Sequence, residues 1–249
     1  MMDPNSRSFD VDSRHYARSR PKYPAEFYDY LCSLLPSRQR LWDCACGNGQ
    51  VAIDLANQFE EIQATDFSEN QLKQAFRHPK ITYQLSAAES TNFPNRHFDL
   101  ICVGQALHWF NIPAFFEEAN RILRSQGVLA IFGYGFFMIS PAIDQLIDHV
   151  LHAAISPYWS DKNRLIMSGF QGVQFPFQQV DIPEFSMNQH WQLKDLLAFV
   201  STWSAVKRYR EEKQQDILEI LQDQLSPLWE QTESKVVKMN LYAYIRQKE

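Results

Sequence analysis

The sequence predicts an α/β protein built on a doubly wound, mostly parallel sheet. Short apolar stretches alternate with helical ones from residue 25 to residue 134, which is the order expected when helices cover both faces of a sheet. Residues 98–103 are nearly all apolar, as in a central parallel strand. Two of the eight glycines are Gly47 and Gly49, and glycine lets a strand turn sharply into a helix because it carries no Cβ.

The alternating half of the chain begins after an irregular N-terminal arm. Ser68 is followed three residues later by Gln71, which is the spacing of a capping box, so we expect a helix to begin there. The other expected elements are helices at 25–35, 50–59 and 112–123, and strands at 40–44, 62–65, 81–85, 98–103 and 128–134.

The pattern changes beyond residue 134, where we expect a helical insertion after the fifth strand. Ser140 and Pro141 suit the N-cap and first turn of a helix that reaches about residue 155. A strand at 178–182 and helices at 193–210 and 213–225 are expected to follow. Apolar and polar side chains then alternate from residue 237 to residue 246, which predicts a half-buried antiparallel edge strand at the C-terminus.

Composition narrows the class of partner. The net charge of −5 argues against nucleic acid and anionic membranes as partners, and no apolar run is long enough for a membrane span. Small molecules are therefore the expected partners, and the sequence does not set the oligomeric state. The four cysteines lie in apolar surroundings, which favours a reduced, cytoplasmic location. Cys44 and Cys46 have no neighbouring His or Cys pair, so no metal site is expected.

The glycine loop is the first candidate site. Its pattern is Asp43-x-Ala45-x-Gly47-x-Gly49, and Gly47, Gly49 and Ala52 also satisfy the dinucleotide fingerprint. A carboxylate at Asp43 would repel a pyrophosphate and attract an ammonium group. The loop therefore favours S-adenosylmethionine over NAD, and a glycine turn without any ligand is the alternative.

Asp66 ends the second expected strand, 17 residues after Gly49, where a carboxylate can accept both hydroxyls of a ribose. A charge placed at a helix N-terminus is the alternative role for Asp66. Phe67 next to it could cover an adenine face, although core packing explains a phenylalanine equally well.

Several motifs together resemble a known family, the class I S-adenosylmethionine-dependent methyltransferases, and in particular the group related to trans-aconitate methyltransferase (methyltransferase type 11). The resemblance covers most of the chain and implies a Rossmann-like sheet. The most specific motif is the run from Gln105 to Phe110. The others are Tyr16-x-x-x-Arg20-Pro21-x-Tyr23-Pro24, Ser86-Ala87-Ala88-Glu89, Phe98-Asp99-Leu100-Ile101, Glu118-x-x-Arg121-Ile122-Leu123, Pro157-Tyr158-Trp159 and Thr202-Trp203-Ser204-Ala205.

The resemblance implies roles for individual residues. S-adenosylmethionine, and its product S-adenosylhomocysteine, would be held by Tyr16, Arg20, Asp43, Ala45, Cys46, Gly47, Gly49, Asp66, Phe67, Ala88, Glu89 and Gln105. Tyr23, Trp159 and Trp203 would contact the substrate. Arg20 could hold a carboxylate of either the cofactor or the substrate. Ala45 stands where the family pattern has the first glycine of the loop. Because alanine carries a Cβ, we expect φ to be negative at this position.

His108 and Trp109 follow the fourth expected strand, at the carboxyl edge of the sheet where ligands bind in such folds. His108 is the candidate to orient the acceptor or take its proton, and a histidine bonded inside the fold is an equal alternative. Trp109 could face the methyl group or belong to the core.

The predicted protein is a single methyltransferase domain over residues 1–249. Residues 1–24 are expected to form an arm or lid, 25–135 the cofactor-binding core, 136–177 a covering insertion and 178–249 the completion of the sheet. The predicted reaction is methylation of a small molecule, with a carboxylic acid as the acceptor that the resemblance suggests. A cofactor-binding protein without turnover and an NAD-dependent oxidoreductase are the alternatives.

Overall fold

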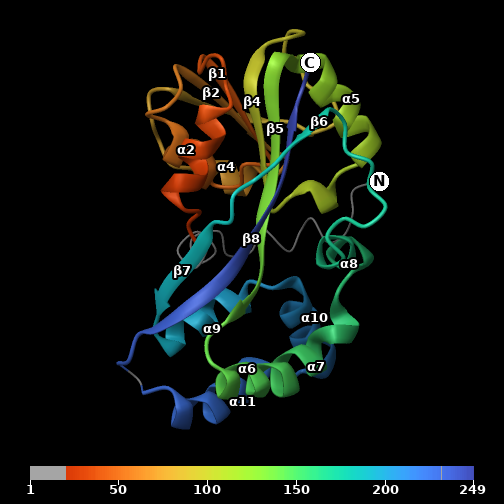
Figure 1. The fold of residues 1–249 in the computed structure, drawn as a ribbon. Coiled ribbons are helices and arrows are strands. Elements are labelled where there is room, and N and C mark those ends of the chain that lie inside the picture. The colour runs from red at the N-terminus through yellow and green to blue at the C-terminus, as the bar shows by residue number, and fades with distance from the viewer. Residues whose placement is uncertain (1–20, 231) are drawn as a thin grey trace.

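The computed structural model describes residues 21–230 and 232–249, and its centre is a mixed sheet (Figure 1). The sheet order is β3-β2-β1-β4-β5-β8-β6, with β7 also paired to β8. Strands β1 to β5 are parallel to their neighbours, and β8 runs antiparallel to β5. The strands are β1 Arg40–Cys44, β2 Glu61–Asp66, β3 Ile81–Leu85, β4 Phe98–Gly104, β5 Leu123–Met138, β6 Gln178–Val180, β7 Ser186–Trp191 and β8 Lys235–Gln247. The predicted doubly wound sheet with an antiparallel C-terminal strand is confirmed.

Helices cover both faces of the parallel part of the sheet. On one face α2 (Ala25–Ser33) and α3 (Gln50–Leu55) pack on the strands through apolar residues such as Phe27 and Leu55. On the other face α5 (Ile112–Ile122) packs through Phe115 against a core that includes Trp42. Helix α4 (Glu69–Lys73) begins after Ser68, whose hydroxyl accepts from Gln71 N–H, as the spacing of these residues predicts.

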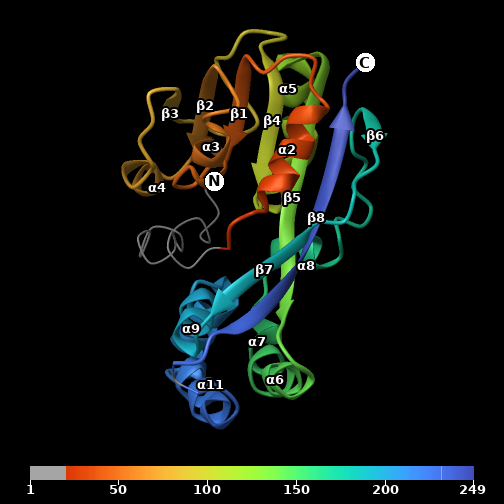
Figure 2. The same ribbon diagram turned by 60° about the vertical axis from the view of Figure 1, so that its left-hand side comes forward.

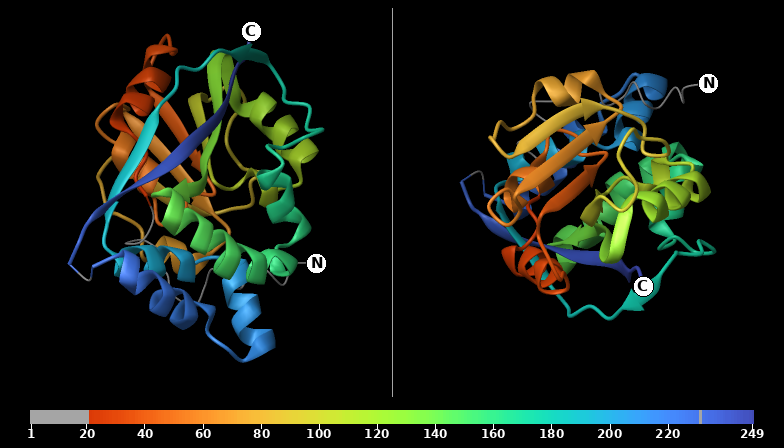
Figure 3. Two further views of the ribbon diagram at one scale, coloured as in Figure 1. Left: turned by 60° about the horizontal axis from the view of Figure 1, so that its bottom comes forward. Right: turned by 90° about the horizontal axis from the view of Figure 1, so that it is seen from above.

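A second body of helices, here called the cap, lies beyond the end of the sheet (Figures 1 and 2). Turned so that this end faces the viewer, the cap helices lie across the end of the sheet (Figure 3). Strands β5 and β8 are long because they run on from the sheet into the cap, which has its own apolar core around Leu151, Leu196 and Leu221. The cap contains α6 Pro141–Ile147, a π turn Asp148–His152, α7 Ala153–Ile155, a 3-10 turn Ser156–Tyr158, α8 Asp161–Met167, α9 Leu193–Ser201, α10 Ser204–Lys213, α11 Ile217–Leu225 and a 3-10 turn Ser226–Leu228.

Strand β8 is not an edge strand, which corrects the expectation from its alternating sequence. One of its edges pairs with β5, and the other pairs with β7 near its start and β6 near its end. Val237 and Met239 are buried in the cap core as expected. On the opposite face Lys238 and Asn240 are exposed, whereas Tyr242 and Tyr244 are partly buried against other parts of the protein.

Two further differences concern the C-terminal half. The single helix expected at 193–210 is broken at Trp203, which has extended backbone angles (φ −70°, ψ 132°) and caps α10. Trp203 is buried among other rings of the cap, so packing overrides the helical sequence pattern there. Helix α8 and strand β7 were not expected from the sequence, because each is short and its burial depends on distant elements.

Two of the motifs that carry the family resemblance stabilise the fold. Asp99 accepts hydrogen bonds from the backbone N–H groups of Gln39 and Arg40 and pairs with Arg124 at 2.7 Å. These bonds tie the start of β1 to β4 and β5. Burial acts to raise the pKa of Asp99, but the hydrogen bonds from Ser37, Arg40 and Arg124 outweigh it and lower the pKa. Glu118 similarly pairs with Arg121 at 2.7 Å.

Within residues 21–230 and 232–249, no helix has the length and apolar character needed to cross a membrane. The same residues contain no group of His, Cys, Asp or Glu side chains that could hold a metal ion.

Candidate active site

The loop after β1 has the backbone conformation that its glycines predict. Gly47 and Gly49 have φ of 56° and 81°, which glycine adopts without strain. A Cβ on Gly49 would overlap the ring of Tyr83, whereas the nearest atom to a Cβ on Gly47 is Gln71 Oε1 at 3.9 Å. The loop therefore needs glycine at Gly49 for packing and at Gly47 for its backbone angle.

Ala45 also has a positive φ, 55°, so the expectation of a negative φ at this position is wrong. The alanine keeps the left-handed conformation that relatives reach with glycine. Its neighbour Cys46 donates its N–H to the Thr65 carbonyl at 2.9 Å, which fixes the loop against β2. Left-handed backbone angles are costly for an alanine. The hydrogen bond of Cys46 to β2 compensates for this cost by holding the loop in place.

Asp66 lies at the end of β2 beside this loop. One carboxylate oxygen accepts from Gly47 N–H and the other from Ser68 N–H, both at 2.8 Å. These bonds fix the carboxylate, and each oxygen of a carboxylate can accept more than one hydrogen bond. The arrangement suits a ligand that presents two neighbouring hydroxyl groups.

Asp43 is almost completely buried, with 1% of its surface exposed. One oxygen accepts from Ala52 N–H at 3.0 Å, and Oδ1 has no hydrogen-bond partner within the described residues. Burial raises the pKa of the Asp43 carboxyl to about 8, with a smaller rise from the charge of Asp66. A buried acid with an unsatisfied oxygen is costly, and a bound cation would relieve that cost.

The far side of the loop carries the residues predicted to border an adenine. Phe67 is 47% exposed, so core packing, the alternative for this residue, does not explain it. Ala88 is buried, and Glu89 accepts from Asn111 N–H at 2.8 Å.

Gln105 follows β4 with a φ of 54° and is held by two hydrogen bonds. Its Nε2 donates to the Tyr134 carbonyl at 2.8 Å, and its Oε1 accepts from the Tyr242 hydroxyl at 2.9 Å. Burial raises the pKa of Tyr242, so this hydroxyl stays protonated and donates. A Cβ on Gly133 would overlap Tyr242 and lie 2.7 Å from Gln105 Oε1, so the absence of a side chain there makes room for the pair.

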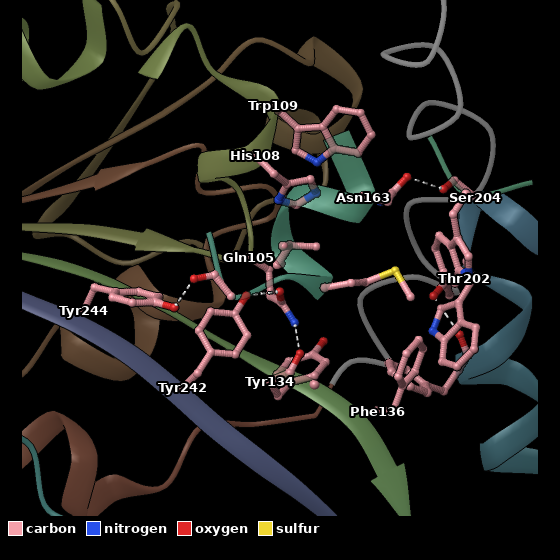
Figure 4. Close-up of a pocket in the computed structure, with 17 residues that line it drawn as sticks. Gln105, His108, Trp109, Tyr134, Phe136, Asn163, Thr202, Ser204, Tyr242 and Tyr244 are labelled. Atoms are coloured by element: carbon pink, nitrogen blue, oxygen red, sulfur yellow. Dashed lines mark hydrogen bonds between the residues drawn. The ribbon is translucent and has the colours of Figure 1, made fainter. Parts of the chain in front are cut away.

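A cavity of about 380 Å³ opens between this edge of the sheet and the cap (Figure 4). His108 and Trp109, on the 3-10 turn Leu107–Trp109 (η2), lie on the sheet side, and Trp159 and Trp203 lie on the cap side. The other described lining residues are Gln105, Tyr134, Gly135, Phe136, Asn163, Ile166, Met167, Gly169, Phe199, Thr202, Ser204, Tyr242 and Tyr244.

The structure thus brings Gln105, His108, Trp109, Trp159 and Trp203 together at one cavity, although they come from distant parts of the chain. Tyr23 is not among the described lining residues. Its ring packs against Phe132 at 4.8 Å on the α2 side of the sheet, and its predicted substrate contact stays a prediction. Tyr16 and Arg20 lie outside the described residues.

The sequence predicted that residues 136–177 cover the pocket but did not single out Phe136 or Asn163, and it missed Tyr134, Tyr242 and Tyr244 as lining residues. The two C-terminal tyrosines could have been found from the strand pattern. The alternation of β8 placed them on the face opposite its core residues, and that face lines the cavity (Figure 4).

Comparison with known proteins agrees with this geometry. The family described as "Methyltransferase domain" matches residues 42–131. A solved structure from Anaeromyxobacter dehalogenans, described as a type II methyltransferase, is 30% identical and superimposes with a TM-score of 0.85, covering 92% of this chain and 97% of that one. The chain belongs to the class I S-adenosylmethionine-dependent methyltransferases. It is therefore an enzyme, which excludes the NAD-dependent oxidoreductase.

Two other proteins are similar to this methyltransferase. A Dictyostelium discoideum protein described as a methyltransferase is 29% identical over 243 residues, 95% of this chain and 92% of that protein. Phosphoethanolamine N-methyltransferase 2 of Haemonchus contortus, solved with S-adenosyl-L-methionine, shares the fold at 15% identity with a TM-score of 0.51, over 99% of this chain and 60% of that one.

The residues of this methyltransferase fit its cofactor, S-adenosylmethionine. The unsatisfied, buried Oδ1 of Asp43 suits an ammonium group, and the fixed carboxylate of Asp66 suits a ribose. The exposed ring of Phe67 suits an adenine face.

Proposed function

We propose that this methyltransferase methylates an oxygen atom of a small molecule bound in the aromatic cavity. The observation that carries the proposal is the cavity itself, which has about the volume of a small-molecule site and is lined by Gln105, a predicted cofactor contact. S-adenosylmethionine, when bound, supplies an electrophilic methyl group. The net charge of −5 supports a small-molecule acceptor over nucleic acid.

The contribution of the protein to catalysis would be mainly positioning. The bonds of Gln105 to Tyr134 and Tyr242 fix the wall between the cofactor residues and the cavity, and the aromatic side chains exclude water. Alignment of two reactants can contribute about 7–11 kcal/mol. His108 is buried and lines the cavity, so we assign to it the orientation of the acceptor, or removal of its proton where the acceptor is not already ionised.

A carboxylic acid is the acceptor that the resemblance to the trans-aconitate methyltransferase group supports. A carboxylate is ionised at neutral pH and needs no general base. The described lining contains no Asp, Glu, Lys or Arg, so its charge would be received by neutral donors or by Arg20. An acid with a mainly apolar body fits this lining best.

The cytoplasmic location belongs to the same proposal. Its support is that all four cysteines are unpaired, as expected in a reducing compartment.

The test is uptake of labelled methyl from S-adenosylmethionine across a panel of small aromatic acids, aliphatic acids and neutral phenols. We expect turnover with at least one aromatic acid and little with the aliphatic acids. Tight cofactor binding without turnover on any acceptor would contradict the proposal and favour a regulatory or scaffold role.

A further inference from the structure

Asn163 is the most buried polar side chain that the cap contributes to the cavity, with 9% of its surface exposed. Its carbonyl oxygen Oδ1 accepts from the Ser160 hydroxyl at 2.6 Å and from the Ser204 hydroxyl at 3.3 Å. The Ser160 oxygen also accepts from the backbone N–H of Asn163 at 3.2 Å. The carbonyl end of the amide is therefore held from two sides, by the N-cap of α8 and the first residue of α10.

The other end of this amide is the nitrogen Nδ2. It makes no hydrogen bond within the described residues and is not among the fully enclosed polar atoms that lack a partner, so part of it is accessible. Because Asn163 lines the cavity, we take this nitrogen as the end of the amide that is open to a ligand there. The result is an N–H₂ group that is fixed in orientation and ready to donate.

Aromatic rings line the same cavity as this donor. Trp203 lies 5.8 Å from Trp159 and 5.6 Å from Phe136, measured between ring centroids. These distances are typical of aromatic packing, and all three side chains line the cavity. Another aromatic ring would extend the same packing.

Helix α8 also contacts the sheet side of the cavity. Lys162 donates to the Trp109 carbonyl at 3.1 Å, and its ammonium lies 5.7 Å from the centre of the Trp109 ring. This contact ties α8, and with it Asn163, to the turn that carries His108. The donor therefore keeps a fixed place relative to the predicted reaction centre.

From these contacts we propose that Asn163 determines acceptor specificity, and that the acceptor is a flat aromatic compound whose oxygen accepts a hydrogen bond from Asn163 Nδ2. The inference rests on the proposed function, since it assumes that the acceptor occupies this cavity. It adds the aromatic body and the residue that recognises its oxygen.

The test measures binding rather than turnover. The protein is saturated with S-adenosylhomocysteine and titrated by calorimetry with 1-indanone, whose oxygen only accepts, and with indane, which lacks that oxygen. The unaltered protein should bind 1-indanone about tenfold or more tightly than indane, because one hydrogen bond distinguishes them. Absence of 1-indanone binding, or equal affinity for both compounds, would overturn the inference.

Asn163→Asp keeps an oxygen for Ser160 and Ser204 but replaces the donor with a second acceptor. We expect affinity for 1-indanone to fall about 10- to 100-fold, while affinity for indane changes less than about twofold. An equal fall for both compounds would make Asn163 a folding residue. Asn188→Asp on the exposed face of β7 is the matched control and should change neither affinity.

Ser204→Ala provides a second variant should Asn163→Asp fail to fold. It removes one of the two hydroxyls that hold the amide, so 1-indanone affinity should fall less, about threefold, with no change for indane. Unchanged 1-indanone affinity in both variants would overturn the inference. A protein that discriminates the two compounds through Asn163 but methylates nothing would keep the role of Asn163 in binding an aromatic ligand and would contradict the proposed function.

Discussion

The cofactor edge and the aromatic cavity lie side by side, but they draw on very different lengths of chain. The predicted cofactor residues from Asp43 to Glu89 lie within about a fifth of the sequence. They come from the ends of β1 and β2, the loops that follow these strands, and the segment after β3. The cavity combines η2, β5, α8, α9, α10 and β8, from Gln105 to Tyr244. The cofactor edge is defined by local backbone geometry, whereas the cavity exists only once the cap has packed.

This difference is also chemical. The predicted cofactor edge contains two buried carboxylates, Asp43 and Asp66, which are 1% and 6% exposed. The described cavity lining has no charged side chain. A polar, charged ligand such as S-adenosylmethionine therefore suits one region and a mainly apolar acceptor suits the other. Variants in each region should affect one ligand and spare the other.

The largest effect is expected from Gly47→Val. A β-branched residue cannot adopt the φ of 56° without strain, and its Cβ would extend from the predicted cofactor loop to within 3.9 Å of Gln71 Oε1. We expect S-adenosylmethionine affinity to fall by about 100-fold or more, from the several kcal/mol that strain and lost contacts cost together. Calorimetric titration measures this, and unchanged affinity would remove the loop from the cofactor site.

Asp66→Ala should have the next largest effect. It removes the acceptor for the ribose hydroxyls, and hydrogen bonds to a charged group contribute about 1.5–3 kcal/mol each. We expect a fall of about 10- to 100-fold in cofactor affinity, with a smaller fall for Asp66→Asn. The same titration with Trp159→Ala is the control from the aromatic cavity. An equal loss of cofactor affinity in both variants would contradict the separation of the two regions.

Asp43 should make cofactor binding depend on pH. Because burial raises its pKa to about 8, the carboxyl of the ligand-free protein is mostly protonated at neutral pH, and an ammonium neighbour would favour the ionised form. Affinity should rise as the pH rises towards about 8, and at pH 7 binding should release about one proton. Calorimetry in buffers of different ionisation enthalpy counts that proton.

Asp43→Asn should abolish this proton release. Proton release that persists in Asp43→Asn would assign it to another group and leave Asp43 as a structural residue.

The raised pKa of Asp43 also predicts a stability change in the ligand-free protein. A carboxyl whose folded pKa lies above its unfolded value stabilises the fold below the unfolded pKa, and this contribution is lost as the pH rises through the folded pKa. The free energy of unfolding should therefore decrease towards about pH 8, and Asp43→Asn should flatten this slope in urea titrations. An identical slope in both proteins would contradict the pKa assignment.

Trp159→Ala should have the smallest effect, confined to the acceptor. The ring contacts Phe136 and Trp203 on the cap side, so its loss should raise the acceptor KM about fivefold to tenfold. The cofactor Kd should stay within about twofold. A similar change in both constants would show that Trp159 supports the fold of the whole site.

The sequence alone determined the parallel half of the fold and the backbone conformation of Gly47 and Gly49 in the predicted cofactor loop. Gly47, Gly49 and Asp66 could be proposed as cofactor residues because a strand, a tight turn and a helix follow one another within a few residues, and local backbone geometry restricts which residues fit. The expectation at Ala45 failed for a tertiary reason, since the bond of Cys46 to β2 holds the loop in a conformation that alanine alone disfavours.

The cavity was decided by the tertiary structure. The hydrogen bond from Tyr242 to Gln105 joins residues 137 positions apart. The orientation of the Asn163 amide likewise depends on Ser204 of α10, which donates to its carbonyl oxygen. No periodicity records such contacts, because short-range patterns report which face of an element is apolar and not what that face meets. Local backbone preferences therefore determined where the predicted cofactor residues lie, and long-range packing of the cap on β5 and β8 determined the shape and chemistry of the proposed acceptor cavity.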